Sequence, residues 1–311
     1  MDKNLLQSPS WLAFESSLGK KTYHEKGANF EYFAYVETTP LGSYLYVPYG
    51  PLLDAKSPKI SLKSALKSLR TLCERESFLF ARIEPRFPFD CAYLENLGLK
   101  KSKDLNPADT WLLDLSPEKE EIIHDFSQGT RTRYNQFSKK GLTVETTKDP
   151  KRIKSLVNLQ AKLAKKKNIK VYSENYLRTE LSQPFATLYE VKYEGKVISA
   201  SLFFDDKNTQ TRYYMQSATD EDYKKLPATV ALLSTAIFDA KENGQQLFDF
   251  WGIAPEGADK SHPWAGFTEF KKSFGGYPAH FAGTYDLPVS WKYPLYSLLR
   301  RLNHLKSKLT H

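Results

Sequence analysis

The pattern of apolar residues predicts the same order of strands and helices in two parts of the chain. In each of two segments, alternating apolar residues indicate paired strands, a loop follows, and apolar residues at helical spacing lead into a closing strand. Val47 and Arg82 in the first segment are as far apart in the sequence as Met215 and Phe250 in the second, which predicts a duplicated β-β-loop-α-β arrangement. The predicted elements lie at residues 30–36, 44–48, 62–74 and 78–83, and at residues 186–193, 197–204, 211–215, 227–243 and 247–251.

Residues 247–276 combine an apolar strand with residues that could bind an anion or take part in catalysis. The strand ends at a glycine, a loop rich in Pro and Gly follows, and residues 267–274 indicate a short helix. Lys271 and Lys272 on this helix would lie near a helix terminus and could hold a phosphate or a developing oxyanion. In the alternative the lysines only face solvent, and the pattern alone leaves both interpretations open. In this alternative, the helix packs on the core through three aromatic residues at helical spacing, Phe267, Phe270 and Phe274.

Three other segments are basic. Residues 128–141 interleave Lys and Arg with aromatic residues, and they either follow a phosphate backbone or form an amphipathic helix with a solvated face. Residues 151–170 indicate a second basic helix, for which a solvated face is favoured. Residues 291–311 carry leucines at helical spacing opposite Lys and Arg. This terminal helix either docks on the first domain, which is favoured, or lies on an anionic membrane surface.

Composition narrows the class of protein. The 311 residues are enough for two domains, and a content of 41% hydrophobic and 26% charged residues indicates a globular fold. The net charge of +9 favours anionic partners such as nucleic acid, anionic lipid or phosphorylated small molecules. Two cysteines, Cys73 and Cys91, are typical of a reduced cytoplasmic protein. We expect no signal peptide, no membrane-spanning helix and no metal site.

Several segments, in order along nearly the whole chain, resemble the Fem family of aminoacyl-tRNA-dependent transferases, which build the peptide bridges of bacterial peptidoglycan. LLQSPSWLAFESSLG resembles the family's N-terminal helix, and YVPYGPLLD resembles its Tyr-x-Pro-x-Gly-Pro segment. DTWLLDLSPEKEEI and TRTRYNQFSKKGLTVE resemble its Asp-Leu-Ser strand and Arg-rich helix. The segment from YYMQSATDEDYKKL to LFDFWGI resembles the core of its second domain, and FTEFKKSFGG resembles its ending.

The resemblance implies an α/β (α+β) fold of two tandem GNAT-like acyltransferase domains, with mixed sheets flanked by helices and a cleft between the domains. The first domain would comprise residues 1–116 and about 284–311, and the second residues 117–283. Some family members insert a helical hairpin that grips tRNA, and no comparable charged heptad run is present here. The implied reaction moves an amino acid from aminoacyl-tRNA to an amine of the stem peptide of a peptidoglycan precursor, lipid-linked or UDP-linked.

The implied chemistry needs no nucleophilic Ser or Cys, because an aminoacyl ester is already activated. The site has to orient the substrates and stabilise charge. By resemblance, Phe270 and Lys271 face the aminoacyl end of the tRNA, and Lys271 supports the transition state. Aminoacyl-tRNA is then a co-substrate, and no other cofactor is expected. We expect a cytoplasmic monomer that contacts aminoacyl-tRNA, the precursor and, peripherally, the inner surface of the membrane.

The resemblance also implies binding residues. Tyr213 or Tyr214 contacts the precursor, and Tyr214 is favoured because alternate strand positions face opposite sides. A second tyrosine falls at Tyr176, but Tyr172 stands where the family often has a phosphate-binding arginine, so Lys170 or Arg178 would substitute. Candidates for tRNA or phosphate contacts are Lys272, Arg131 and Arg133. Candidates for the phosphate-site lysine of the first domain are Lys20, Lys21 and Lys26.

Two rival functions remain. An acyl-CoA N-acyltransferase on the same fold would need a Gly-rich pyrophosphate loop before a helix. The corresponding loops, residues 49–58 and 219–227, lack it, and the second of these, TDEDYKKLP, is acidic. A non-catalytic RNA-binding protein would show salt-dependent RNA binding without any transfer.

Overall fold

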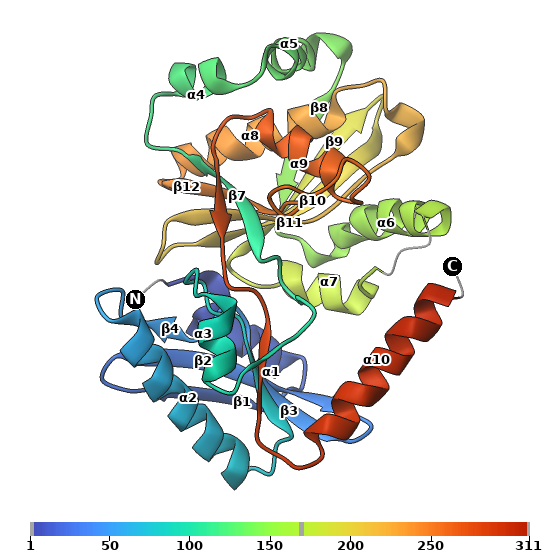
Figure 1. Ribbon diagram of the computed structural model, residues 1–311. Helices are drawn as coiled ribbons and strands as arrows, with labels where there is room; N and C mark the ends of the chain where they lie inside the picture. Colours follow the sequence, from blue (N-terminus) through green and yellow to red (C-terminus); the bar gives the residue numbers. More distant parts are fainter. Residues whose placement is uncertain (1–2, 168–170, 310–311) are drawn as a thin grey trace. The chain divides into compact units, whose positions relative to one another are not determined.

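The computed structural model describes residues 3–167 and 171–309, and it describes only the backbone of residues 167, 301 and 303–309. The chain divides into two compact units (Figure 1). The first unit comprises Met1–Ala108 and His280–His311, and the second comprises Asp109–Ala279. Each unit is built on a seven-stranded mixed sheet.

The first sheet has the strand order β1-β2-β3-β5-β14-β6, with β4 paired to β2. Strand β14 comes from the C-terminal part of the chain and pairs antiparallel with both β5 and β6. The strands are β1 (Thr22–Lys26), β2 (Phe30–Thr39), β3 (Gly42–Val47), β4 (Leu52–Leu53), β5 (Phe80–Ile83), β6 (Lys100–Lys101) and β14 (Tyr285–Pro288). The helices are η1 (Leu5–Gln7), α1 (Pro9–Ser17), α2 (Pro58–Arg75), α3 (Cys91–Asn96) and α10 (Tyr293–Leu309).

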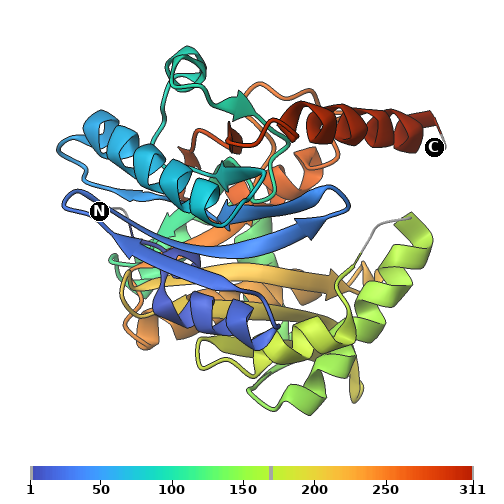
Figure 2. The same cartoon turned by 90° about the horizontal axis from the view of Figure 1, so that it is seen from below.

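The core of the first unit lies between its sheet and α2, which packs along one face of the sheet (Figure 2). Helix α2 has Pro58 in its first turn, where the missing N–H costs nothing. Leu62, Ala65, Leu66 and Leu69 recur at helical spacing and are buried. The predicted helix at residues 62–74 is therefore confirmed, with one more turn at its start.

The second sheet has the strand order β13-β7-β12-β11-β10-β9-β8. The strands are β7 (Asp109–Asp114), β8 (Thr143–Thr147), β9 (Ala186–Tyr193), β10 (Lys196–Asp206), β11 (Thr211–Thr219), β12 (Leu247–Gly252) and β13 (Tyr277–His280). The helices are α4 (Lys119–Asp125), α5 (Gln128–Gln136), η2 (Ser138–Lys140), η3 (Pro150–Ile153), α6 (Lys154–Lys167), α7 (Glu174–Leu181), η4 (Glu221–Tyr223), α8 (Ala228–Glu242) and α9 (Ala265–Lys272).

Helices cover both faces of the second sheet at β10. Every residue from 198 to 204 on this strand is buried, although neighbouring side chains on a strand point to opposite faces. Helices α6 and α8 both pack against β10, and α8 contributes its apolar residues to a cluster with β12. The central strands are thus buried as in an α/β sheet, which confirms the predicted fold class.

The duplicated arrangement predicted from the apolar pattern is present in both units. In the first unit α2 connects β3 to the parallel strand β5, and in the second α8 connects β11 to the parallel strand β12. Tyr46 pairs with Arg82, and Tyr213 pairs with Asp249, with the same separation in the sequence. The two crossovers therefore match in length and in register.

Strand β7 lies in the second sheet, although the sequence analysis placed residues 109–116 in the first domain. Its Asp114 pairs with Leu247 and its Thr110 with Gly252, both on β12. The second unit therefore begins at Asp109 and ends at Ala279, rather than spanning residues 117–283. An alternating apolar strand can join either sheet, because its local pattern does not specify its partner.

Candidate functional site

Strand β12 bends where it leaves its neighbour β7. The pairing shifts register between Asp249 and Gly252, and Trp251 adopts a φ of 64°, a left-handed conformation that is rare for a bulky side chain. The buried carboxylate of Asp249 holds this bend: it accepts a hydrogen bond from the backbone N–H of Trp251 at 2.7 Å and another from the hydroxyl of Thr110. The end of β12 is therefore fixed in a strained conformation.

The ammonium of Lys271 lies against this bend. Its Nζ donates to the backbone carbonyl of Gly252 at 2.5 Å and lies 3.4 Å from that of Trp251. Burial lowers the pKa of Lys271 to about 8, although the negative charge of Asp249 acts in the opposite direction. Lys271 is in the last turn of α9, where the helix dipole favours a cation. It therefore carries its charge at pH 7 and loses it only slightly above that pH.

Tyr214 lies near Lys271, just past the point where β11 stops pairing with β12. These strands pair only from Thr211↔Leu247 to Tyr213↔Asp249 among the described residues, so the later part of β11 runs free of β12. The ring of Tyr214 lies 5.9 Å from Nζ of Lys271, and its hydroxyl donates to Ser217 at 2.8 Å. Tyr213 is buried, with its ring against Trp251. Of the two predicted tyrosines, Tyr214 is the one near the lysine.

A basic pocket lies beside the residue that precedes Lys271. It encloses about 490 Å³, and it is lined by Phe270 and by the cationic side chains of Arg133, Lys140, Lys224 and Lys225. Its wall includes the first turn of α8, a helix of fifteen residues whose first N–H groups have no partners within the helix. Cations and a helix N-terminus together provide a site suited to phosphate groups.

The pocket corrects the prediction that the loop at residues 219–227 is unsuited to a pyrophosphate. Its acidic residues lie in η4 and its N-cap, where Asp220 pairs with Lys162 at 2.9 Å and Glu221 pairs with Lys166. The two lysines that follow line the pocket instead. The charge argument against a phosphate ligand does not hold, because the acidic residues and the lysines of this loop lie in different places. The loop still contains no glycine, as the sequence analysis noted.

Phe267 does not pack in the core as the sequence analysis supposed. Its side chain is 58% exposed, whereas Phe274 is fully buried and Phe270 packs partly against the core of the second unit. Helix α9 ends at Lys272, so Phe274 lies beyond the helix. The helical spacing that grouped the two outer phenylalanines therefore does not apply.

The predicted tRNA contacts separate in the structure. Arg133 lines the basic pocket. Arg131 instead donates to backbone carbonyls of His124 and Phe126 at the end of α4, which is a structural role. Lys272 pairs with Glu269 at 3.1 Å and faces solvent.

The predicted precursor contacts on α7 are not in the site at β12. Tyr176 stacks on Tyr172 with ring centroids 4.7 Å apart, and Arg178 pairs with Glu174 on the same helix. Helix α7 packs against η3, β9 and α6. Lys170 lies outside the described residues.

In the first unit, two of the three candidate lysines are held by carboxylates. Lys20 pairs with Glu15 at 2.9 Å and with Glu37 at 2.6 Å, and Lys21 pairs with Glu76 at 2.7 Å. Lys26 is exposed on β1.

Sequence reasoning missed the residues that shape the bend and most of the basic pocket. Asp249 stands between two buried phenylalanines in an apolar strand, and an acid in such a position was the available signal. Lys140, Lys224 and Lys225 gave no comparable signal, because they converge only in the folded unit. Within the described residues, no cluster of three or more His, Cys, Asp or Glu side chains could hold a metal ion.

Comparisons with known proteins agree with this geometry. Residues 183–301 match the model of the FemAB family, and no curated protein sequence matches the chain. The crystal structure of FemX superposes with a TM-score of 0.78 at 18% identity, covering 95% of this chain and 94% of that chain. The structure of L-PGS from Bacillus licheniformis gives a TM-score of 0.60 at 16% identity, covering 96% of this chain and 98% of that one.

A tandem GNAT protein from the clavulanic acid biosynthesis pathway gives a TM-score of 0.53 at 12% identity, covering 90% of this chain and 94% of that chain. At these identities the structural matches show the fold. Together with the family model, they confirm the predicted resemblance to a Fem-family, GNAT-like protein and the fold of two tandem GNAT-like units.

Proposed function

We propose that this Fem-like protein transfers an amino acid from aminoacyl-tRNA to an amine of the stem peptide of a peptidoglycan precursor. The observation that carries the proposal is the ammonium of Lys271, which burial brings to a pKa of about 8 at the bend of β12. Next to it, Phe270 forms part of a pocket lined by cations. A positive charge beside a basic pocket suits acyl transfer from an RNA end.

The transfer step needs charge stabilisation above all. The precursor's amine attacks the ester carbonyl, a tetrahedral oxyanion forms, and the ester C–O bond then breaks as the ribose oxygen leaves and takes up the proton that the amine loses. A preorganised ammonium in a site with little water stabilises the oxyanion strongly. Lys271 can also relay this proton, giving its own to the ribose oxygen and regaining one from the amine, because its pKa of about 8 lies close to neutral pH.

The basic pocket supports RNA as the donor of the amino acid. Arg133, Lys140, Lys224 and Lys225 offer charge to successive phosphates, and Phe270 offers an aromatic face for a base. The aminoacyl ester at the 3′ end of the strand would then lie next to Lys271, which follows Phe270 in the chain. Tyr214, on the other side of the ammonium, would contact the acceptor.

The experiment combines purified protein with a panel of charged tRNAs, each carrying a labelled amino acid, and with UDP-linked and lipid-linked precursors. Label should appear on the precursor with at least one tRNA. Lys271→Met should lower the rate by a hundredfold or more, as loss of one oxyanion stabiliser does, while the neighbouring Lys272→Met should keep the parent rate. If no precursor gains label across the panel, the proposal is wrong.

An acyl-CoA donor is the second candidate, because the pocket at the start of α8 would also accept a pyrophosphate. The loop before α8 has no glycine to bring backbone N–H groups close to such a ligand. Acetyl-CoA therefore serves as a parallel donor in the same assay. Transfer from acetyl-CoA but from no tRNA would favour this candidate.

A further inference from the structure

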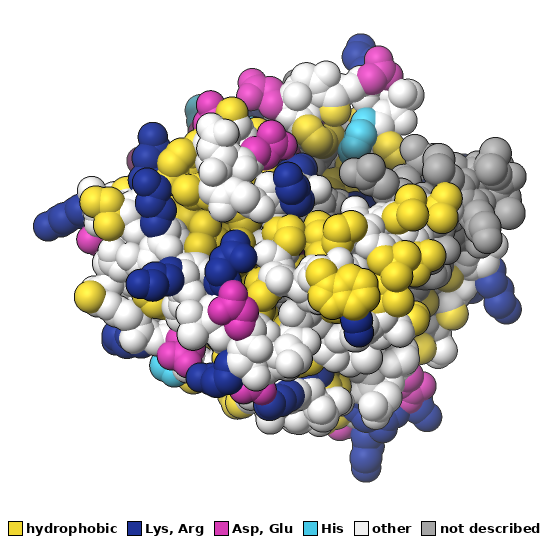
Figure 3. Space-filling model, turned by 60° about the horizontal axis from the view of Figure 1, so that its bottom comes forward, with side chains coloured by type: hydrophobic (Ala, Val, Ile, Leu, Met, Phe, Trp, Pro, Cys, Tyr) yellow, Lys and Arg dark blue, Asp and Glu magenta, His cyan; other side chains and the backbone are white. Residues whose placement is uncertain are grey.

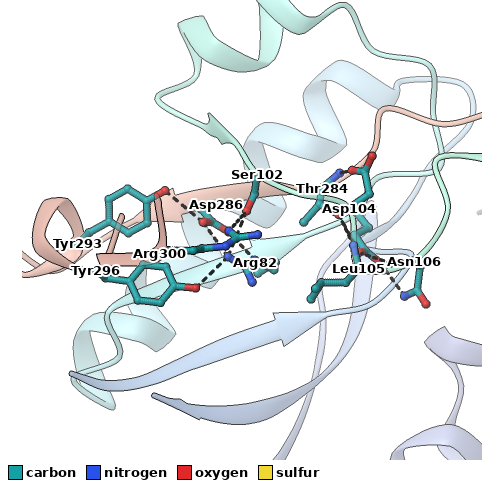
Figure 4. A network of polar contacts seen from close by, with 11 residues as sticks. Arg82, Ser102, Asp104, Leu105, Asn106, Thr284, Asp286, Tyr293, Tyr296 and Arg300 are labelled. Carbon is teal, nitrogen blue, oxygen red and sulfur yellow. Dashed lines mark hydrogen bonds and ion pairs between the residues drawn. The ribbon is translucent and has the colours of Figure 1, made fainter. Parts of the chain in front are cut away.

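The C-terminal helix α10 is attached to the first unit by a polar face. Tyr293 donates to Asp286 at 3.1 Å, Arg82 donates to the hydroxyl of Tyr296 at 3.2 Å, and Arg300 donates to Ser102 (Figure 4). The residues of α10 in these contacts are three or four positions apart, so they lie on one side of the helix. This side faces β14 and the segment after β6.

The opposite side of α10 is an apolar stripe open to solvent. Its exposed fractions are 83% for Trp291, just before the helix, and 47%, 54%, 41% and 45% for Leu295, Leu298, Leu299 and Leu302. Single exposed leucines are normal on a protein surface, but a contiguous stripe indicates an interaction site. The sequence analysis favoured docking of this helix on the first domain. The helix does pack on the first unit, but through its tyrosines and Arg300 rather than through its leucines.

The charged residues of the terminal segment have one sign. Between residues 289 and 311 every charged side chain is Lys or Arg, in a chain that contains 36 Asp and Glu in total. On the packed side of α10, away from the stripe, Lys101, Lys103 and Arg300 line a pocket of about 560 Å³ together with Asp286. Figure 3 shows one face of the molecule, on which exposed hydrophobic side chains border Lys and Arg side chains, with Asp and Glu side chains also on that face.

We infer that α10 is a membrane-docking helix that lies in the surface of an anionic bilayer. Trp291 and the four leucines would enter the acyl region near the headgroups, and the exposed Lys292 next to Trp291 would face the lipid phosphates. The positive charge of the terminal segment would add attraction to an anionic surface. A protein partner with an apolar groove would also cover the leucines, but it would not require that every charged residue of the segment be basic. The helix would lie on the surface rather than cross it, since no described helix is long and apolar enough to span a membrane.

The test measures binding of the full-length protein to sedimented vesicles. Vesicles that contain phosphatidylglycerol should bind the protein, and vesicles of phosphatidylcholine alone should bind it at least about tenfold more weakly, because the cations then have no partner. Added salt should weaken binding to the anionic vesicles. Failure to bind them at low salt would overturn the inference.

A double substitution tests the stripe itself. Leu298→Ser with Leu299→Ser keeps the charge and should weaken vesicle binding by about tenfold or more, because several buried methylene groups are lost. Ile60→Ser is the matched control, since Ile60 is 64% exposed on α2, and it should bind as the parent does. Equal binding by all three proteins would overturn the inference.

Two further readouts distinguish membrane docking from misfolding and from self-association. Circular dichroism should be the same for all variants, since the replaced side chains are exposed. Sedimentation velocity should show a monomer at every concentration. A dimer that the double substitution abolishes, without any vesicle binding by the parent, would assign the stripe to a second copy instead. Transfer to a soluble precursor should be unchanged by the substitution, so this test is independent of the proposed function.

Discussion

Replacing Lys271 by methionine should stabilise the fold at pH 7 while it removes activity. The ammonium is held in a site that lowers its pKa from 10.5 to about 8. A tenfold change in proton affinity corresponds to about 1.4 kcal/mol, so the charged lysine weakens the fold by about 3 kcal/mol at pH 7. Methionine has a similar shape and no charge, and the hydrogen bonds to the carbonyls of Trp251 and Gly252 that it cannot replace are a loss that does not depend on pH between 7 and 8.

The sign of the pH dependence follows from the lowered pKa of Lys271. Below pH 8 both the folded and the unfolded chain hold the proton, so the buried charge lowers the stability of the fold by its full amount, which is the penalty. As the pH rises from 8 to 10.5, the folded chain loses the proton while the unfolded chain keeps it, and the penalty disappears. The stability advantage of Lys271→Met should therefore shrink by about 2–3 kcal/mol between pH 7 and pH 10.

Urea unfolding followed by tryptophan fluorescence measures this difference at a series of pH values. Lys272→Met is the matched control, because it removes the same charge from an exposed position one residue away. A difference between Lys271→Met and the parent that stays the same from pH 7 to pH 10 would refute the reasoning. Such a result would mean that the ammonium is not held in a desolvated site.

Three other predictions concern the fold. Burial raises the pKa of the Cys73 thiol to about 12, so a thiol reagent should label only the exposed Cys91 in the folded protein and both thiols in denaturant. Arg82→Met should lower the free energy of unfolding by about 3–5 kcal/mol, because it leaves the carboxylate of Asp286 buried and unpaired by its cation; Asp286→Leu in the same chain should restore much of the loss in urea titrations. Gly276→Ala should cost about 1–3 kcal/mol by the same measurement, since its Cβ would lie 2.1 Å from a carbonyl oxygen of β7 and its φ is 91°.

The sequence predicted best where local pattern and burial agree. Helix α2 and strand β10 have apolar residues at the spacing that their packing requires, so their type and position could be foreseen. The equal separations in the two halves anticipated the matched parallel pairs of the two sheets. These features depend on short stretches of chain, in which periodicity carries most of the information.

The sequence predicted poorly where the outcome depends on a distant partner. Strand β7 has no local mark that assigns it to the second sheet, and the leucines of α10 looked like a packing face until Tyr293 and Arg300 proved to make the contacts. Lys271 was singled out through resemblance, and its role stays a prediction. Its lowered pKa was not foreseen, because that value comes from burial against the bend of β12.

Strand β14 has a consequence for the order in which the chain can fold during synthesis. It lies between β5 and β6 in the first sheet, yet the ribosome makes it after the entire second unit. Until residues 285–288 emerge, β5 and β6 each expose an unpaired edge, and exposed edges invite pairing with other chains. The second unit, made from one continuous segment, can complete its sheet earlier. A nascent chain, or a truncated chain without its last residues, should therefore depend on chaperones to protect its first unit. Its second unit should not need them.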